Sequence, residues 1–129
     1  SRGAPGNTIS HTTSYWVPKH TKHVFVPKVD VVSGLGYDNA AKLPEVTRAR
    51  HEIRAVVSNL GVFDFQTDDH RMRIRSIHPG VKLDDVIANT GFELIVPADL
   101  PETRTPTADE VALIRALDPK GIADKELGA

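Results

Sequence analysis

The first ten residues contain the side chains and backbone groups best suited to chemistry. Glycine and proline between Ser1 and Ser10 bring backbone N–H groups close together, and Arg2 and Asn7 add polar donors. A loop of this kind can stabilise an oxyanion or an enolate, because donors fixed before the reaction need no reorganisation when charge develops. The alternative interpretation is a surface turn between two strands, with Arg2 as a solvated charge.

A second group of candidates follows directly in the chain. His11 precedes three hydroxyl-bearing residues and can move a proton or orient a carbonyl group. Tyr15 and Trp16 can either pack their rings against other residues, with the polar end of each ring exposed, or contact a ligand. His11 and Tyr15 are therefore secondary candidates for substrate binding.

The sequence predicts no metal site. His20 and His23 are three residues apart but adjoin a predicted strand that would aim them differently, and the other histidines are scattered. The acidic residues 64, 68 and 69 lack the glycine and the final glutamate of a calcium loop. No nucleophile stands beside a base either, so we expect the principal base or nucleophile to come from another chain or from a preceding part of the protein.

Composition limits the kinds of partner that the chain can have. The 129 residues carry 16 basic and 17 acidic side chains, so the excess positive charge that favours nucleic acid or an anionic membrane is missing. There is no cysteine and no apolar run long enough for a membrane helix, which favours a cytoplasmic protein. The opening Gly/Pro-rich stretch predicts a chain that starts in the middle of a protein, after a strand.

Several segments have the composition of β-strands. We expect strands at 23–26, 29–32 and 92–96, and a hairpin with one solvated face formed from the segments 53–60, 62–65 and 72–77. Residues 37–50 show no periodicity and are predicted to form a loop.

Two segments have the signature of helices. Leu83, Val86 and Ile87 follow helical spacing, with Gly91 placed where a C-cap would be. Thr107 and Glu110 form a predicted capping box for a helix that ends before Pro119. Interleaved strands and short helices favour an α/β fold.

Four ordered motifs resemble one protein family. They are residues 56–65 (VVSNLGVFDF), 76–81 (SIHPGV), 89–94 (NTGFEL) and 106–110 (PTADE). In this order they look like the C-terminal region of class I CoA-transferase β subunits, particularly the glutaconate CoA-transferase type. The resemblance implies an open mixed α/β sheet with flanking helices, in which residues 1–129 are the C-terminal part of a single domain.

Within this family, the stretches 1–11, 13–17 and 29–34 look most like β subunits of actinobacterial cholesterol ring-cleaving hydrolases. Arg2 stands where the transferases tend to have a small residue, which argues against ordinary CoA transfer. The resemblance implies that a partner α subunit supplies a glutamate base, and that Arg2 with the loop of Gly3, Ala4 and Asn7 holds the developing negative charge. It also implies an α2β2 heterotetramer, with CoA as part of the substrate and no separate cofactor. The alternative is a true CoA-transferase subunit, and a further alternative is a non-enzymatic subunit that only stabilises its partner.

Overall fold

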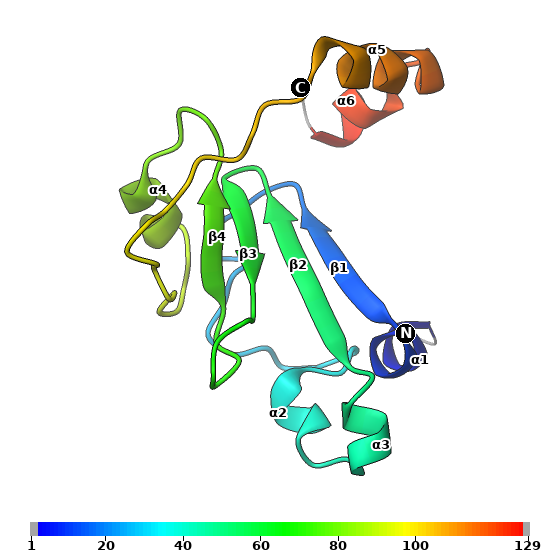
Figure 1. The fold of residues 1–129 in the computed structure, drawn as a ribbon, viewed down its shortest axis with the longest axis vertical. Helices are drawn as coiled ribbons and strands as arrows, with labels where there is room; N and C mark the ends of the chain where they lie inside the picture. Colours follow the sequence, from blue (N-terminus) through cyan, green and yellow to red (C-terminus); the bar gives the residue numbers. More distant parts are fainter. Residues whose placement is uncertain (1–2, 128–129) are drawn as a thin grey trace.

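A four-stranded mixed sheet lies at the centre of the computed structural model, which describes residues 3–127 (Figure 1). Its strands are β1 (Thr12–Val17), β2 (Glu52–Ser58), β3 (Gly61–Asp64) and β4 (Arg73–Ile77), in the order β1-β2-β3-β4. β1 pairs in parallel with β2, whereas β3 pairs antiparallel with both β2 and β4. The predicted α/β class with an open mixed sheet is confirmed.

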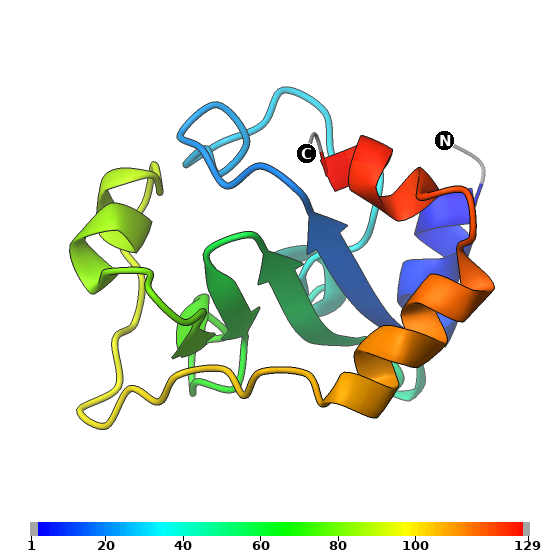
Figure 2. The same cartoon turned by 90° about the horizontal axis from the view of Figure 1, so that it is seen from above.

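Short helices surround this sheet. They are α1 (Gly3–Ser10), α2 (Tyr37–Ala40), α3 (Glu45–Arg48), α4 (Leu83–Ala88), α5 (Ala108–Leu117) and α6 (Ile122–Leu127). Figure 1 shows α1 beside the start of β1 and α4 beside β4, at opposite edges of the sheet. Figure 2 shows the connector after α4 crossing from the β4 side of the sheet to the β1 side before α5 begins. None of the helices within residues 3–127 has the length and apolar character needed to cross a membrane.

The core lies between the sheet and α4. Its fully buried members are Phe63 of β3, Ile74 of β4 and Val86 of α4, and three further residues complete it: Phe25, Val56 and Leu94. Burying each such side chain contributes about 1.5–3 kcal/mol to folding. The predicted helix around Val86 is confirmed: it is α4, and its apolar residues Val86 and Leu83 pack in or against the core.

Three predicted strands are wrong. In the segment 23–26 the N–H groups of Val24 and Phe25 both donate to the carbonyl of Thr21, at 2.9 and 2.8 Å, so the chain turns instead of extending. The segment 29–32 is irregular, and its Val31 is 82% exposed. The segment 92–96 makes a single bridge, between Ile95 and Arg73. Segments rich in apolar and β-branched residues form strands only where they pair with a neighbouring strand over several residues. The segment 92–96 pairs with β4 at one position only, and the segments 23–26 and 29–32 pair with no strand among the described residues.

The loop predicted at 37–50 is also wrong, because α2 and α3 lie within it. Each helix is only four residues long, too short for a periodic pattern to appear in the sequence. In both, the N–H of the residue after the helix donates to a carbonyl of the first turn.

One helix end was predicted correctly and one was not. The capping box of α5 is present: Thr107 accepts from the Glu110 N–H, and the Glu110 carboxylate accepts from the Thr107 N–H. Hydrogen bonds from Arg104 lower the pKa of Glu110 to about 2.

The predicted C-cap of α4 is wrong, because the C-cap is Asn89 and Gly91 lies beyond it. The Gly91 N–H donates to the Phe25 carbonyl oxygen at 2.7 Å, and a Cβ on Gly91 would lie 2.5 Å from that oxygen.

Substituting Gly91 by alanine tests this close approach. We expect Gly91→Ala to lower the free energy of unfolding by about 1–3 kcal/mol, because the backbone at Phe25 must move to admit the methyl group. Urea unfolding followed by circular dichroism measures the change. Gly36→Ala is the matched control, since a Cβ on Gly36 meets nothing within 4 Å. Equal stability of the two variants would contradict the steric argument.

Candidate functional site

The predicted glycine-rich loop at the start of the chain is a helix. Gly3–Ser10 forms α1, which corrects the expected loop conformation of Gly3, Ala4 and Asn7. Pro5 is tolerated because it lies in the first turn, where its missing N–H would have no partner in the helix. The Thr8 hydroxyl donates to the Ala4 carbonyl at 2.7 Å and reinforces this turn. Arg2, the main catalytic candidate, lies outside the described residues.

The start of α1 still offers the donors that the sequence predicted for an anion. The N–H groups of Gly3 and Ala4 are in the first turn, where an α-helix has no internal acceptor for them. The positive end of the helix dipole lies at the same place. Asn7 is one turn further on, and its Nδ2 lies 4.0 Å from the position of a Cβ on Gly3. Gly3, Ala4 and Asn7 are therefore brought together, by a helix end instead of a loop.

Thr8 anchors α1 to two distant segments. Its side chain is 2% exposed, and its hydroxyl oxygen accepts from the Leu35 N–H at 2.8 Å. Its carbonyl oxygen accepts a hydrogen bond from His51 Nδ1 at 2.6 Å. Neither Thr8 nor His51 was predicted as a site residue, because a single threonine in a polar stretch and one of six histidines carry no local signal.

His11 and Tyr15 lie away from the start of α1. His11 is exposed just beyond the last turn, and its N–H donates to the Asn7 carbonyl. Eight helical residues span about 12 Å, which separates it from the donors of Gly3. Tyr15 is 39% exposed on β1, with its hydroxyl 3.4 Å from the position of a Cβ on Gly34. Their roles in substrate binding stay predictions.

A second polar cluster is buried where β1 and β2 end. His20 is 3% exposed, and its ring stacks on Phe25 with centroids 3.7 Å apart. The Thr90 hydroxyl donates to a carbonyl of α4, so it accepts from His20 Nε2 at 2.9 Å. His20 Nδ1 is then an acceptor, and the Ser58 hydroxyl donates to it at 2.9 Å. Burial lowers the pKa of His20 to about 4, which keeps the ring neutral.

This cluster has the atoms of a serine–histidine pair but not the access that catalysis needs. Ser58 is fully buried, and its oxygen also accepts from the Leu60 N–H at 3.1 Å. Every polar atom of the His20 ring is paired. We interpret the cluster as a support that joins β1, β2 and α4. In the part of the chain that the structure describes, no three acidic or histidine side chains gather as a possible metal site.

Comparison with known proteins shows what the chain is similar to. It is 55% identical over 128 residues to the cholesterol ring-cleaving hydrolase IpdB subunit of Rhodococcus jostii, covering 98% of this chain and 50% of that protein. The crystal structure of Rhodococcus jostii RHA1 IpdAB is similar with a TM-score of 0.86 and 52% identity, covering 97% of this chain and 50% of that one. Glutaconate CoA-transferase from Acidaminococcus fermentans is similar with a TM-score of 0.76 and 26% identity, covering 88% and 44%.

These similarities confirm the resemblance inferred from the motifs, including the CoA-transferase-like fold class. The chain is a homologue of these subunits, although no protein-family model matches it. It spans about half the length of the curated relatives it matches. The prediction that it corresponds to their C-terminal half is not tested by these comparisons.

Replacing Thr8 by valine tests the anchoring of α1. We expect Thr8→Val to lower the free energy of unfolding by about 1–3 kcal/mol, because the Leu35 N–H loses its acceptor. Amide hydrogen exchange should also become faster at Leu35. Thr13→Val is the matched control, because the Thr13 hydroxyl makes one exposed hydrogen bond at 3.3 Å. Unchanged exchange at Leu35 in Thr8→Val would show that this hydrogen bond does not hold the segment.

The lowered pKa of His20 predicts a pH dependence of stability. Between the ordinary histidine pKa of 6.5 and about 4, the unfolded chain binds a proton that the folded chain excludes. The free energy of unfolding should therefore fall as pH drops through this range, with the contribution of neutral His20 fully present above it. Urea midpoints at about pH 7.5 and about pH 5 measure the fall. His20→Gln should reduce it and His23→Gln should not; an equal fall in both variants would exclude His20 as the cause.

Proposed function

We propose that the chain is part of the β subunit of a heteromeric hydrolase that opens a carbon ring of a steroid-derived CoA thioester. The 55% identity to a subunit named for cholesterol ring cleavage carries this proposal. In the proposal, residues 1–129 are the C-terminal part of a single domain. The whole enzyme is a cytoplasmic α2β2 heterotetramer that needs no cofactor besides the CoA of its substrate.

The proposed chemistry is hydrolysis of a carbon–carbon bond. Water, deprotonated by a glutamate of the α subunit, adds to a ring carbonyl and forms a tetrahedral oxyanion. The ring bond breaks as the carbonyl reforms as a carboxylic acid, and its electron pair leaves on carbon as an enolate that takes up a proton. The thioester stays intact, so CoA remains attached to the opened product.

The start of α1 suits the negative charge that this chemistry generates. The N–H groups of Gly3 and Ala4 point toward the end of the helix that carries partial positive charge. The arrangement is fixed before reaction, because Thr8 ties α1 to Leu35 and His51. In the proposal Arg2, which directly precedes Gly3 in the sequence, contributes a full positive charge, and Asn7 adds a polar side chain one turn further along α1. His11 and Tyr15 are proposed as more distant substrate contacts.

A true CoA-transferase subunit is the second candidate. Glutaconate CoA-transferase shares the fold with a TM-score of 0.76, and the matching polypeptide of that transferase in Acidaminococcus fermentans is 26% identical over 120 residues. Such an enzyme forms a covalent thioester between an enzyme glutamate and CoA, whereas the proposed hydrolase forms none. The lower identity makes this candidate the weaker one.

Removing the positive charge of Arg2 tests the proposal. In the intact polypeptide assembled with its α subunit, Arg2→Ala should lower kcat for a steroid-derived CoA thioester by about a hundredfold or more, because one oxyanion donor is lost. Arg2→Lys should retain part of the rate, since it keeps the charge. The assay is mass-spectrometric detection of the ring-opened CoA thioester, with circular dichroism as the check on folding.

Arg115→Ala is the matched control, because Arg115 is exposed on α5, distant in sequence from α1. Unchanged kcat in Arg2→Ala would remove Arg2 from the mechanism. A covalent enzyme–CoA thioester, trapped with an acyl-CoA donor, would favour the transferase instead.

A further inference from the structure

Residues 27–33 form an exposed segment between the core residue Phe25 and α2. Every residue of the segment is exposed, and three of them are valines: Val29 at 50%, Val31 at 82% and Val32 at 59%. A single exposed apolar side chain is ordinary in a folded protein, but a contiguous apolar patch marks a surface that another molecule covers. The three valines lie within four positions, so the segment presents such a patch.

The backbone of the same segment is also unpaired. Among the described residues, no N–H or C=O group of residues 27–33 forms a hydrogen bond with another backbone group. The segment 29–32 has the β-branched composition of a strand, and such a segment forms one when a neighbouring strand pairs with it. Free N–H and C=O groups beside exposed valines are what an added strand requires.

Both ends of the segment are fixed to the rest of the chain. Before it, the carbonyl oxygen of buried Phe25 accepts from the Gly91 N–H at 2.7 Å. After it, the Leu35 N–H donates to the Thr8 hydroxyl oxygen at 2.8 Å. A segment held at both ends loses less conformational entropy when it pairs than a free peptide would. Residues 27–33 are therefore already presented for pairing.

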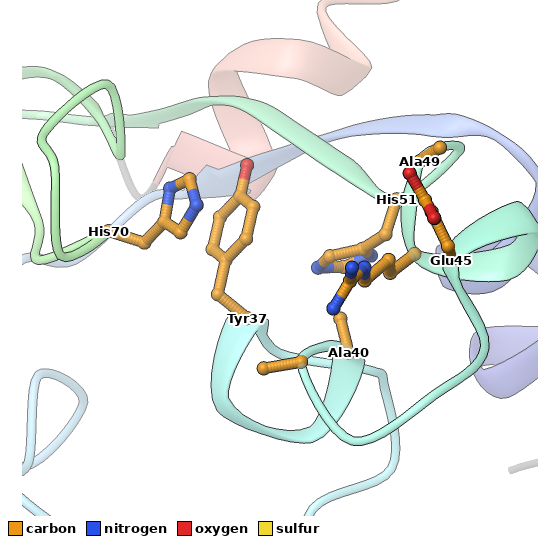
Figure 3. A pocket seen from close by; sticks show the side chains of 8 residues that line it. Tyr37, Ala40, Glu45, Ala49, His51 and His70 are labelled. Atoms are coloured by element: carbon orange, nitrogen blue, oxygen red, sulfur yellow. The ribbon is translucent and has the colours of Figure 1, made fainter.

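The first residue of α2 holds the second end further. Figure 3 shows the Tyr37 ring between the rings of His70 and His51. Its centroid lies 4.1 Å from that of His70 and 4.8 Å from that of His51. The Tyr37 hydroxyl accepts from the Ile53 N–H at 3.0 Å. These contacts tie α2 to β2 and to the connection between β3 and β4, so the chain is fixed directly after the exposed segment.

The position of the segment beside α1 indicates which partner covers it. A Cβ on Gly34 would lie 3.3 Å from Thr8 Cγ2, so the segment ends against α1. In the proposed function, a glutamate of the α subunit acts at the start of this helix. α1 is only about 12 Å long. A standard interface covers about 800 Å² of each partner, a patch about 30 Å across, so an α subunit that reaches the start of α1 also reaches the segment.

We propose that residues 28–33 pair with a strand of the α subunit and extend the subunit interface by β-strand addition. The inference rests on the proposed function for the identity of the partner. Side chains alternate along a strand, so the pairing would place Val29 and Val31 on one side and Val32 on the other. Pro27 has no N–H group to donate, and the pairing ends there.

A photoreactive side chain at position 31 of the assembled enzyme identifies the partner. With p-benzoylphenylalanine in place of Val31, we expect a cross-link to the α subunit, located by mass spectrometry of the linked peptides. The same replacement at Val96, an exposed valine in the connector after α4, is the matched control and should give little linking. The proposal is overturned by a link from position 31 to the preceding part of the same polypeptide, by a link to a second β subunit, by no link, or by equal linking from both positions.

Amide hydrogen exchange distinguishes strand pairing from contact through side chains alone. Successive N–H groups of a strand point to opposite sides, so one added strand accepts from every second group. In the assembled enzyme, residue-resolved exchange along 28–33 should therefore alternate between slow and fast. Fast exchange at every position, or slow exchange at every position, would contradict the addition of a single strand.

A charge at position 31 tests what the segment contributes to assembly. Val31→Asp should weaken binding of the intact β polypeptide to the α subunit by about tenfold or more, because the carboxylate loses its water. Val31→Thr keeps the branched shape and should weaken binding less. Val96→Asp is the matched control and should leave binding unchanged. Sedimentation of the mixed subunits measures binding, with circular dichroism as the check on folding; equal binding by Val31→Asp and Val96→Asp would reject the interface.

The proposed function can fail separately. A cross-link from position 31 to the α subunit, in an enzyme that leaves steroid-derived CoA thioesters unopened, would sustain the interface and reject the hydrolase.

Discussion

The hydrogen bonds of Thr8 are the constraint on which the candidate site depends. α1 is short and rich in glycine and proline, so its own propensity gives it little stability. Thr8 replaces that missing stability with tertiary contacts, through the Leu35 N–H and the His51 ring. Because His51 directly precedes β2, these contacts also fix the position of α1 relative to the sheet.

Two buried histidines support opposite ends of the parallel pair β1 and β2. His51 lies where β2 begins, and His20 lies beyond the end of β1, paired with Ser58 and Thr90. Both rings hold a definite tautomer because a neighbouring group can act only as a donor or only as an acceptor. They differ in that His20 has both nitrogens paired, whereas the buried Nε2 of His51 has no hydrogen-bond partner among the residues that the structure describes. His20 therefore joins β1, β2 and α4, and His51 anchors α1 through the Thr8 carbonyl oxygen.

The helical form of α1 changes the physical basis of the proposed chemistry. A flexible loop would have to be ordered before its N–H groups could stabilise a negative charge. A helix end already aligns the donors of Gly3 and Ala4 and adds the helix dipole. In the proposed mechanism, Arg2 and a glutamate of the partner subunit act together with these prealigned donors. The chain itself spans about half the length of the curated relatives it matches.

The sequence by itself determined the features that depend on near neighbours. Three such features are the capping box at Thr107 and Glu110, the apolar side of α4 and the hairpin of β2 and β3. Each involves residues that are close together in the chain, so the sequence pattern alone predicts it. The ordered motifs also identified the family resemblance and the fold class. Tertiary structure alone decided the helical form of α1, the irregular path of 23–32 and the use of Gly91 for close packing against Phe25. Each of these depends on a partner distant in sequence, and local propensity carries no information about such a partner.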